Sequence, residues 1–177
     1  MACTISKGRL DYSCKTIIGG LKNIYIGDFE QSVADLSVSV GQIDLSAISP
    51  SVYKYELVND GNTFEESNEA NEMAGTSTFT QTGTFVLKGQ DAISQVELQN
   101  LAKNKVQIYV EDHMGNLRAA GREFGCVVTV GTTSGGAIGD MNGYNVSFTA
   151  RSTELAPFCL MEDLEVESAV GDVIDPN

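Results

Sequence analysis

The stretch TSTFTQTGTFVL, residues 76–87, carries the longest strand pattern in the chain. Threonine stands at every second position from Thr76 to Thr84, and small, polar and aromatic residues take the positions between. The branched Cβ of threonine suits a pleated sheet. A strand with a threonine face cannot lie wholly inside a core, so we expect one side to meet solvent, a lumen or another subunit.

Other segments alternate apolar and polar residues in the same way. In residues 22–28, Ile24 and Ile26 lie on one predicted face and Tyr25 on the other, which is typical of a half-buried strand. Further strands are predicted at 36–40, 51–59, 105–110, 117–131 and 144–149.

Turns and one helix connect these strands. The turn signal at 59–62 predicts a hairpin that returns through Thr63 and Phe64, and the signal at 112–116 predicts a second hairpin. Asp91 is a good N-cap for a helix over residues 92–104. Ile93, Val96 and Leu101 lie on roughly one face of that helix.

This order of elements predicts a mainly-β fold of two packed antiparallel sheets, a sandwich or barrel, with one flanking α-helix. A chain of 177 residues suits a single domain. We expect an N-terminal arm over 1–16, the β-domain over 17–151 and an acidic C-terminal extension over 152–177. The acidic tail is expected to be free or ordered by a partner.

Residues 65–77 are rich in glutamate and contain no basic residue. Such a segment buries little apolar area, so we expect a long, exposed and mobile loop. Loops of this length are often functional, and in an assembling protein the function is contact with a neighbour; an ordinary solvated loop is the alternative. The candidates for inter-subunit contact are Glu65, Glu66, Asn68, Glu69, Asn71, Glu72 and Met73.

Composition argues against several classes of function. The formal net charge of -13 disfavours binding to nucleic acid, which requires clustered Lys and Arg. The N-terminus lacks a signal-peptide core and the chain lacks a long apolar run, so we expect neither export nor a membrane anchor. The cysteines are scattered without a C-x-x-C pair, which favours reduced thiols in a cytoplasm-like compartment.

The residues that carry chemistry in enzymes are scarce. His113 is the only histidine and falls in a predicted turn, and Cys126 precedes an apolar run and is expected to be a small buried hydrophobe. The glycine-rich segment 131–143 lacks the lysine of a phosphate loop. Residues 140–143 lack the acidic spacing of a calcium loop. We therefore expect no catalytic, cofactor or metal site, and no enzyme.

Two segments, IIGGLKNIYI at 17–26 and GDMNGYNVSFT at 139–149, are similar to sequences of bacteriophage tail tube proteins. These proteins are related in fold to the tubes of contractile injection systems. The resemblance covers residues 17–151 and implies hexameric rings whose inner strands join around a lumen and which stack into a tube. It implies no catalytic residue and no cofactor.

The expected function is thus a structural virion protein of the tail, assembled in the host cytoplasm. Its partners would be further copies of itself and other tail or neck proteins, with DNA only as passing cargo. Acidic or hydroxyl side chains would line the lumen, with Thr78, Thr80 and Thr82 as candidates. The alternatives are another virion component (neck, tail-terminator or capsid decoration protein) or, in a different class, a small acidic binding module or hydrolase.

Overall fold

The computed structural model describes residues 8–9, 17–57 and 60–167. Most of the expected N-terminal arm and the last part of the acidic tail, 168–177, lie outside the described residues, as does Asn59 of the first predicted turn. The strands are β1 (Leu21–Asp28), β2 (Ser51–Glu56), β3 (Thr63–Asn71), β4 (Thr76–Lys88), β5 (Val106–Asp112), β6 (Leu117–Ala120), β7 (Cys126–Thr133), β8 (Gly143–Ser152), β9 (Phe158–Cys159) and β10 (Glu165–Glu167). The helices are α1 (Gln31–Ala34), α2 (Ala92–Lys103) and the short 3-10 helix Met161–Asp163.

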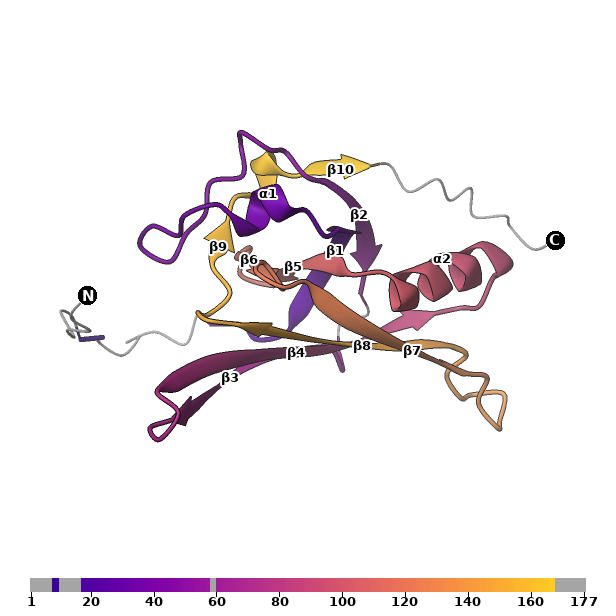
Figure 1. The fold of residues 1–177 in the computed structure, drawn as a ribbon. Coiled ribbons are helices and arrows are strands. Elements are labelled where there is room, and N and C mark those ends of the chain that lie inside the picture. The colour runs from indigo at the N-terminus through magenta and orange to yellow at the C-terminus, as the bar shows by residue number, and fades with distance from the viewer. Residues whose placement is uncertain (1–7, 10–16, 58–59, 168–177) are drawn as a thin grey trace.

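The prediction of a mainly-β fold with a flanking helix is confirmed. The strands form one continuous sheet in the order β10-β2-β1-β5-β7-β8-β4-β3, with β6 paired to β5 and β9 paired to β6. The sheet folds over into an upper layer of β1, β2, β5 and β6 and a lower layer of β7, β8, β4 and β3 (Figure 1). Only the pair Val106 and Cys126 joins β5 to β7, so the two layers diverge from this point. The sheet is mixed because β10 runs parallel to β2.

The main core lies between the two layers. Every strand of both layers except β2 and β3 contributes buried apolar side chains to it, and Leu98 of α2 closes one side. Large buried members are Ile24, Ile26, Phe85, Ile108, Tyr144, Val146 and Phe148. Cys126 is fully buried among them, as predicted.

A second core covers the other face of the upper layer. Tyr25 and Tyr109 point into it and meet Val33, Leu45 and Leu164 from the segments that cross above the sheet. The prediction that residues 22–28 form a strand is therefore confirmed, but the prediction that this strand is half-buried is wrong. Both of its faces are covered, since Tyr25 is as buried as the two isoleucines.

The helix begins where the sequence predicts, because the Asp91 carboxylate accepts a hydrogen bond from the Ser94 N–H at 2.8 Å. Of the residues on the predicted apolar face, only Leu101 packs against the core. Leu98 and Leu101 pack against the core, whereas Ile93 and Val96 are 56% and 54% exposed.

Residues 36–40 do not form the predicted strand. They follow α1 and lead into a tight turn in which Ser39 pairs with Gln42 and Val40 has a φ of 54°. Leu36 and Val38 instead pack onto the second core from a crossing segment. The alternation of apolar residues there reflects packing onto one surface rather than a strand.

The first predicted hairpin is also wrong. β2 pairs with β1 and β10, whereas β3 pairs with β4, so the turn near Gly61 carries the chain from one layer to the other. The hairpin at 112–116 is confirmed, since β5 and β6 pair and the Asp112 side chain accepts hydrogen bonds from the Met114 and Asn116 N–H groups. Its return strand is broken into β6 and β7 by a turn at 121–125.

Residues 153–167 fold back onto the upper layer. Ala156, Cys159 and Leu164 are buried there, and β10 pairs with β2 over residues 165–167. The side chain of Asp163 is buried and lies 3.4 Å from the Leu45 N–H, which donates to it. The first part of the acidic extension is thus held by the chain itself.

The Phe148 ring lies against the backbone of β4 at Gly83, where a side chain would have no room. The two residues are partners in the β4–β8 ladder, and a Cβ on Gly83 would overlap the ring. We expect Gly83→Val to lower the free energy of unfolding by about 1–3 kcal/mol because the core cannot yield this space without moving the ring. Urea denaturation measures the change, and Gly131→Val is the control, since a Cβ there meets only the Asn145 carbonyl at 3.8 Å. Equal free energies of unfolding for the two variants would contradict the role of Gly83 in making room for the Phe148 ring.

Candidate functional site

The outer face of the lower layer is covered by hydroxyl side chains. Strand alternation sends Gln81, Gly83 and Phe85 of β4 inward and the threonines between them outward. We call this surface the hydroxyl face. Its hydroxyl residues are Thr63 and Ser67 of β3, Thr78, Thr80, Thr82 and Thr84 of β4, Ser147 and Thr149 of β8, and Thr129 of β7.

The strand register aligns these residues in rows across the layer. One row runs from Thr63 through Thr84 and Ser147 to Thr129. The hydroxyl groups of Thr63 and Thr84 lie 2.9 Å apart and share a hydrogen bond, which fixes both side chains on the same face. The next row runs from Glu65 through Thr82 and Thr149 to Val127. The surface is therefore polar but bears few charges.

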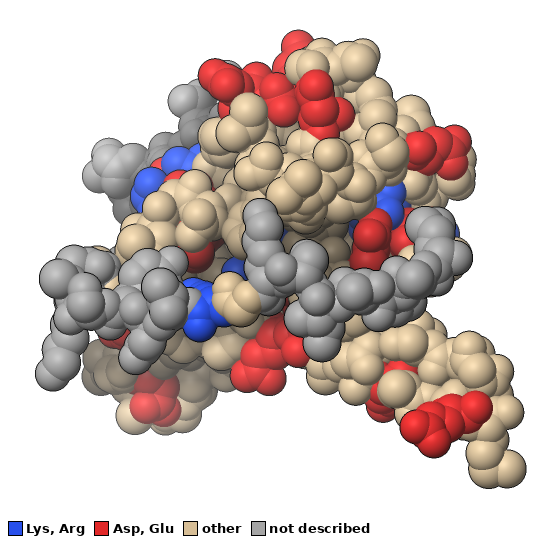
Figure 2. Space-filling view, turned by 90° about the vertical axis from the view of Figure 1, so that its left-hand side faces the viewer, with Lys and Arg blue, Asp and Glu red and all other residues tan. Residues whose placement is uncertain are grey.

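The charged residues on this face are few compared with the net charge of the chain. On β3, β4 and β8 they are Glu65, Glu69, Lys88 and Arg151. Acidic side chains outnumber basic ones on the face drawn in Figure 2, where they lie in separate groups. Most of the negative charge thus lies away from the hydroxyl face.

The expected long loop at 65–77 is instead a hairpin. β3 and β4 pair from Thr63 and Thr84 out to Asn71 and Thr76, and only residues 72–75 form the turn. β8 ends at Ser152, opposite Phe79, so from Glu69 and Thr78 outward only two strands remain. We call residues 69–78 the ribbon. Every residue in it is exposed, and it projects past the end of the lower layer (Figure 1).

The contact candidates take different places on this hairpin. Glu65 and Glu69 lie on the hydroxyl face, and Glu72 and Met73 lie in the turn, where Met73 is fully exposed. The other three make contacts within the chain. Asn68 donates to the Ser77 hydroxyl, Asn71 accepts from the Ala74 N–H, and Glu66 points inward with its side chain only 8% exposed.

The lower layer has two open edges. β3 ends the strand order, so its outer edge pairs with no other described strand. On the opposite side, β7 meets β5 only at Cys126, which leaves Val127–Thr133 without a strand partner there among the described residues. Open edges present unpaired N–H and C=O groups that readily pair with another chain.

The predicted lumen candidates Thr78, Thr80 and Thr82 all belong to the hydroxyl face, where Thr78 and Thr82 are exposed and Thr80 is half-buried. Sequence reasoning missed Thr129, Ser147 and Thr149, their neighbours from other strands. Ser147 and Thr149 alternate with apolar residues in 144–149, whereas Thr129 lies in an apolar run, and the strand register that aligns all three with β4 is not visible in the sequence.

Groups with the potential for chemistry are dispersed. Burial raises the pKa of the Cys126 thiol to about 12 and that of the Cys159 thiol to about 12, so both stay protonated at neutral pH. His113 lies half-buried in the turn between β5 and β6. Within residues 8–9, 17–57 and 60–167, no three His, Cys, Asp or Glu side chains gather in a way that could hold a metal ion.

Asp140 has a local structural role. Its carboxylate accepts hydrogen bonds at 2.8 Å from the N–H groups of Gly136 and Ala137, which lowers its pKa. These bonds close a turn over residues 136–140, in the connection between β7 and β8.

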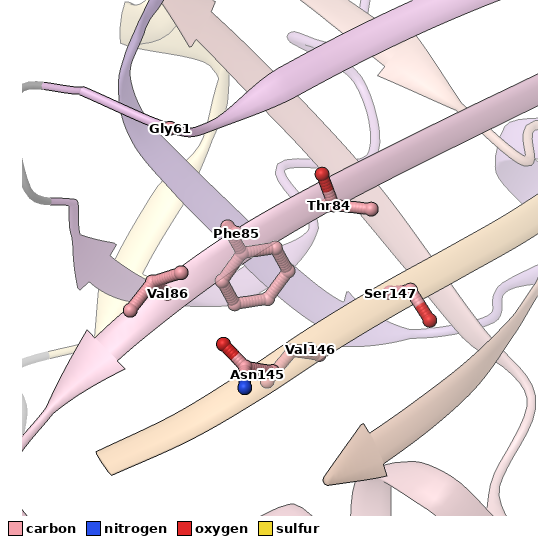
Figure 3. Close-up of a pocket in the computed structure, with 7 residues that line it drawn as sticks. All are labelled: Gly61, Thr84, Phe85, Val86, Asn145, Val146 and Ser147. Carbon is pink, nitrogen blue, oxygen red and sulfur yellow. The ribbon is translucent and has the colours of Figure 1, made fainter. Parts of the chain in front are cut away.

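A pocket of about 280 Å³ lies where β4 and β8 extend past the start of β3 (Figure 3). Its lining residues are Gly61, Thr84, Phe85, Val86, Asn145, Val146 and Ser147. None of them can act as a general acid or base. The pocket offers small polar groups and apolar surface but no reactive group.

Within the described part of the chain, no helix is long and apolar enough to span a membrane. Comparison with protein-family models, with curated proteins and with solved structures found no match to this chain.

Proposed function

We propose that the chain is a structural subunit of a bacteriophage tail tube, in which copies join into hexameric rings that stack around a DNA-conducting lumen. The observation that carries the proposal is the lower layer: one hydroxyl face, two open edges and a projecting ribbon belong to the same four strands.

The open edges supply a route to a ring. If β3 of one copy pairs with β7 of the next, both rows of unpaired backbone groups acquire partners. The two edges are different, so the contact is head-to-tail, and such contacts close into rings when the rotation between copies permits. Closing the sheet across subunits places one face of the lower layer inward all around the ring.

The hydroxyl face suits the inner wall. Phosphate groups adhere to surfaces with clustered Lys and Arg. This face offers Arg151, in the row between those of Glu65 and Glu69, and Lys88 at the far end of β4, so its basic residues are not clustered. Short hydroxyl side chains stay hydrated and leave the wall smooth. DNA would therefore pass with little attraction to any one position.

The ribbon suits contact with a neighbouring copy. A two-stranded hairpin is marginally stable on its own in water. Residues 69–78 lie beyond β8 and bury no side chain within the chain. Packing against another subunit would provide the third strand or surface that they lack.

Chemical labelling tests the assignment of the inner wall. We expect Thr82→Cys to react with a polyethylene-glycol maleimide in dissociated subunits and to be protected in assembled tubes, because the polymer reagent does not enter a narrow lumen. The variant is made with Cys3→Ser and Cys14→Ser, since Cys126 and Cys159 are already buried. The control is Val40→Cys, at a fully exposed site above the upper layer. Equal labelling of Thr82→Cys in tubes and in subunits would place the hydroxyl face outside.

A further inference from the structure

A polar pair interrupts the core at the point where the hairpin leaves the body of the domain. Glu66 of β3 and Gln81 of β4 are partners in the ladder, and both side chains point inward. The partner pair on the body side, Phe64 and Gly83, packs under the Phe148 ring. On the other side the inward-facing pair Asn68 and Phe79 follows, and then the exposed ribbon. We call Glu66 and Gln81 the polar rung.

Each residue of the polar rung bonds to a segment that crosses from the upper layer. The Gln81 carbonyl oxygen accepts a hydrogen bond from the Gly121 N–H at 2.9 Å, in the turn after β6. The Glu66 carboxylate accepts one from the Ala156 N–H at 2.7 Å, and its other oxygen lies 3.5 Å from an Arg118 guanidinium nitrogen.

The partners of Glu66 are themselves fixed. The Arg118 guanidinium stacks over the Phe158 ring at 4.8 Å. The backbone of Phe158 exchanges hydrogen bonds with the 39–43 segment, accepting from the Ile43 N–H and donating to the Gly41 carbonyl. One carboxylate thus connects the base of the hairpin to β6 and to two crossing segments.

Apolar contacts can hold two layers together but constrain direction weakly, whereas hydrogen bonds require a defined geometry. Only one inward-facing pair, Asn68 and Phe79, separates the polar rung from the ribbon, so a geometric constraint there acts at the base of the hairpin. A small rotation at Glu66 and Gln81 would displace Met73, which lies farther along the same two strands.

We infer that the polar rung is a positioning device, in which Glu66 and Gln81 set the direction of the ribbon so that its tip meets a neighbouring copy. This inference rests on the proposed function for its consequence in assembly. Its structural part, the direction of the ribbon in a single subunit, can be measured without any tube.

The test combines Glu66→Leu and Glu66→Gln with a matched control, Glu56→Gln. Glu56 also forms an ion pair, with Lys54 at 2.8 Å, but on the exposed surface of β2. Two readouts are taken: amide residual dipolar couplings of residues 69–78 relative to residues 82–87, at concentrations below tube formation, and the critical concentration for tubes. Thermal unfolding of each variant confirms that the domain is folded.

We expect the ribbon couplings of Glu66→Leu to shrink toward zero while those of residues 82–87 stay at wild-type values. The critical concentration should rise about tenfold, as for the loss of a charge-assisted hydrogen bond. Glu66→Gln retains an acceptor for the Ala156 N–H and should show a smaller change, and Glu56→Gln should match the wild type. If Glu66→Leu does not fold, the same readouts on Glu66→Gln decide.

Wild-type couplings in a folded Glu66 variant would overturn the positioning role. Altered couplings with an unchanged critical concentration would overturn its link to assembly. A wild-type chain that forms no tubes would contradict the proposed function, and the couplings would still decide whether the polar rung directs the ribbon.

Discussion

Replacing residues 70–77 by Asn-Gly is expected to give a folded subunit that no longer forms tubes. The replacement removes the tip of the ribbon and closes the hairpin after Glu69 and before Thr78. Glu69 and Thr78 pair two positions before Asn71 and Thr76 in the ladder. Because hydrogen-bonded and non-hydrogen-bonded pairs alternate, a pair of the same type flanks the new turn and the present one. Asn-Gly favours the tight turn that such a pair needs. The removed residues bury no side chain within the chain, so the domain should lose little stability.

Negative-stain electron microscopy and sedimentation velocity measure the loss of assembly, and near-ultraviolet circular dichroism confirms the fold. The control is Met73→Ala, which shortens the exposed side chain at the tip but keeps the ribbon. We expect it to weaken tube formation without abolishing it. Tubes of normal length from the Asn-Gly variant would show that the ribbon is not an assembly contact.

The largest expected loss of stability follows from Arg122→Met. The Arg122 side chain is buried between the turn at 121–125 and the segment that follows α1. One guanidinium nitrogen donates to the Ala34 and Leu36 carbonyls, at 2.8 Å each, and the other pairs with Glu154 and Glu123. This single side chain thus holds the crossing segment, the 121–125 turn and the start of the C-terminal segment together.

Methionine fills a similar volume but removes the donor to the two part-buried carbonyls and the cation beside Glu154 and Glu123, although Glu123 keeps its hydrogen bonds to Thr153. Each of the two charge-assisted hydrogen bonds to the carbonyls is worth roughly 1.5–3 kcal/mol, and the pair with the partly exposed Glu154 adds less. Urea denaturation of unassembled subunits measures the change, with Arg151→Met, at an exposed position on the hydroxyl face, as the control expected to lie within about 0.5 kcal/mol of the wild type. Equal free energies of unfolding for the two variants would contradict the role of Arg122. Arg122→Lys should recover only part of the loss, since an ammonium group cannot reproduce the planar fork.

The sequence predicted those elements in which apolar and polar residues alternate, or in which a capping residue lies next to the element. Burial alternates with period two over Gln81–Phe85 of β4 and over Tyr144–Ser152 of β8. The Asp91 cap lies in the sequence immediately before its helix. Tyr25 was expected to face solvent because its burial depends on the segments around Leu45 and Leu164, far away in the chain. When distant segments bury a residue, the sequence around that residue does not show it.

Two other errors have different physical origins. Helix α2 carries both Ile93 with Val96 and Leu98 with Leu101, and only packing against the core decides which pair is buried. The sequence did not predict strand β3 from Glu65 onward, because β3 is polar on both faces beyond Phe64. Its ladder with β4 is held by backbone bonds, which composition does not reveal.

The candidate site was predicted in part. Thr78, Thr80 and Thr82 were singled out from one strand, and they do share a face. That this face extends over Ser147, Thr149 and Thr129 depends on the register of three strands far apart in sequence. Glu66 was grouped with exposed contact residues, but its inward orientation gives it a different set of partners.

Electron microscopy of the purified chain over a series of rising concentrations tests the central claim most directly. The account predicts tubes of stacked rings with a continuous central channel, in equilibrium with unassembled subunits. Closed rings that never stack would contradict the tube and favour a neck or tail-terminator component. A chain that remains monomeric at every concentration would contradict assembly through the open edges of the lower layer altogether.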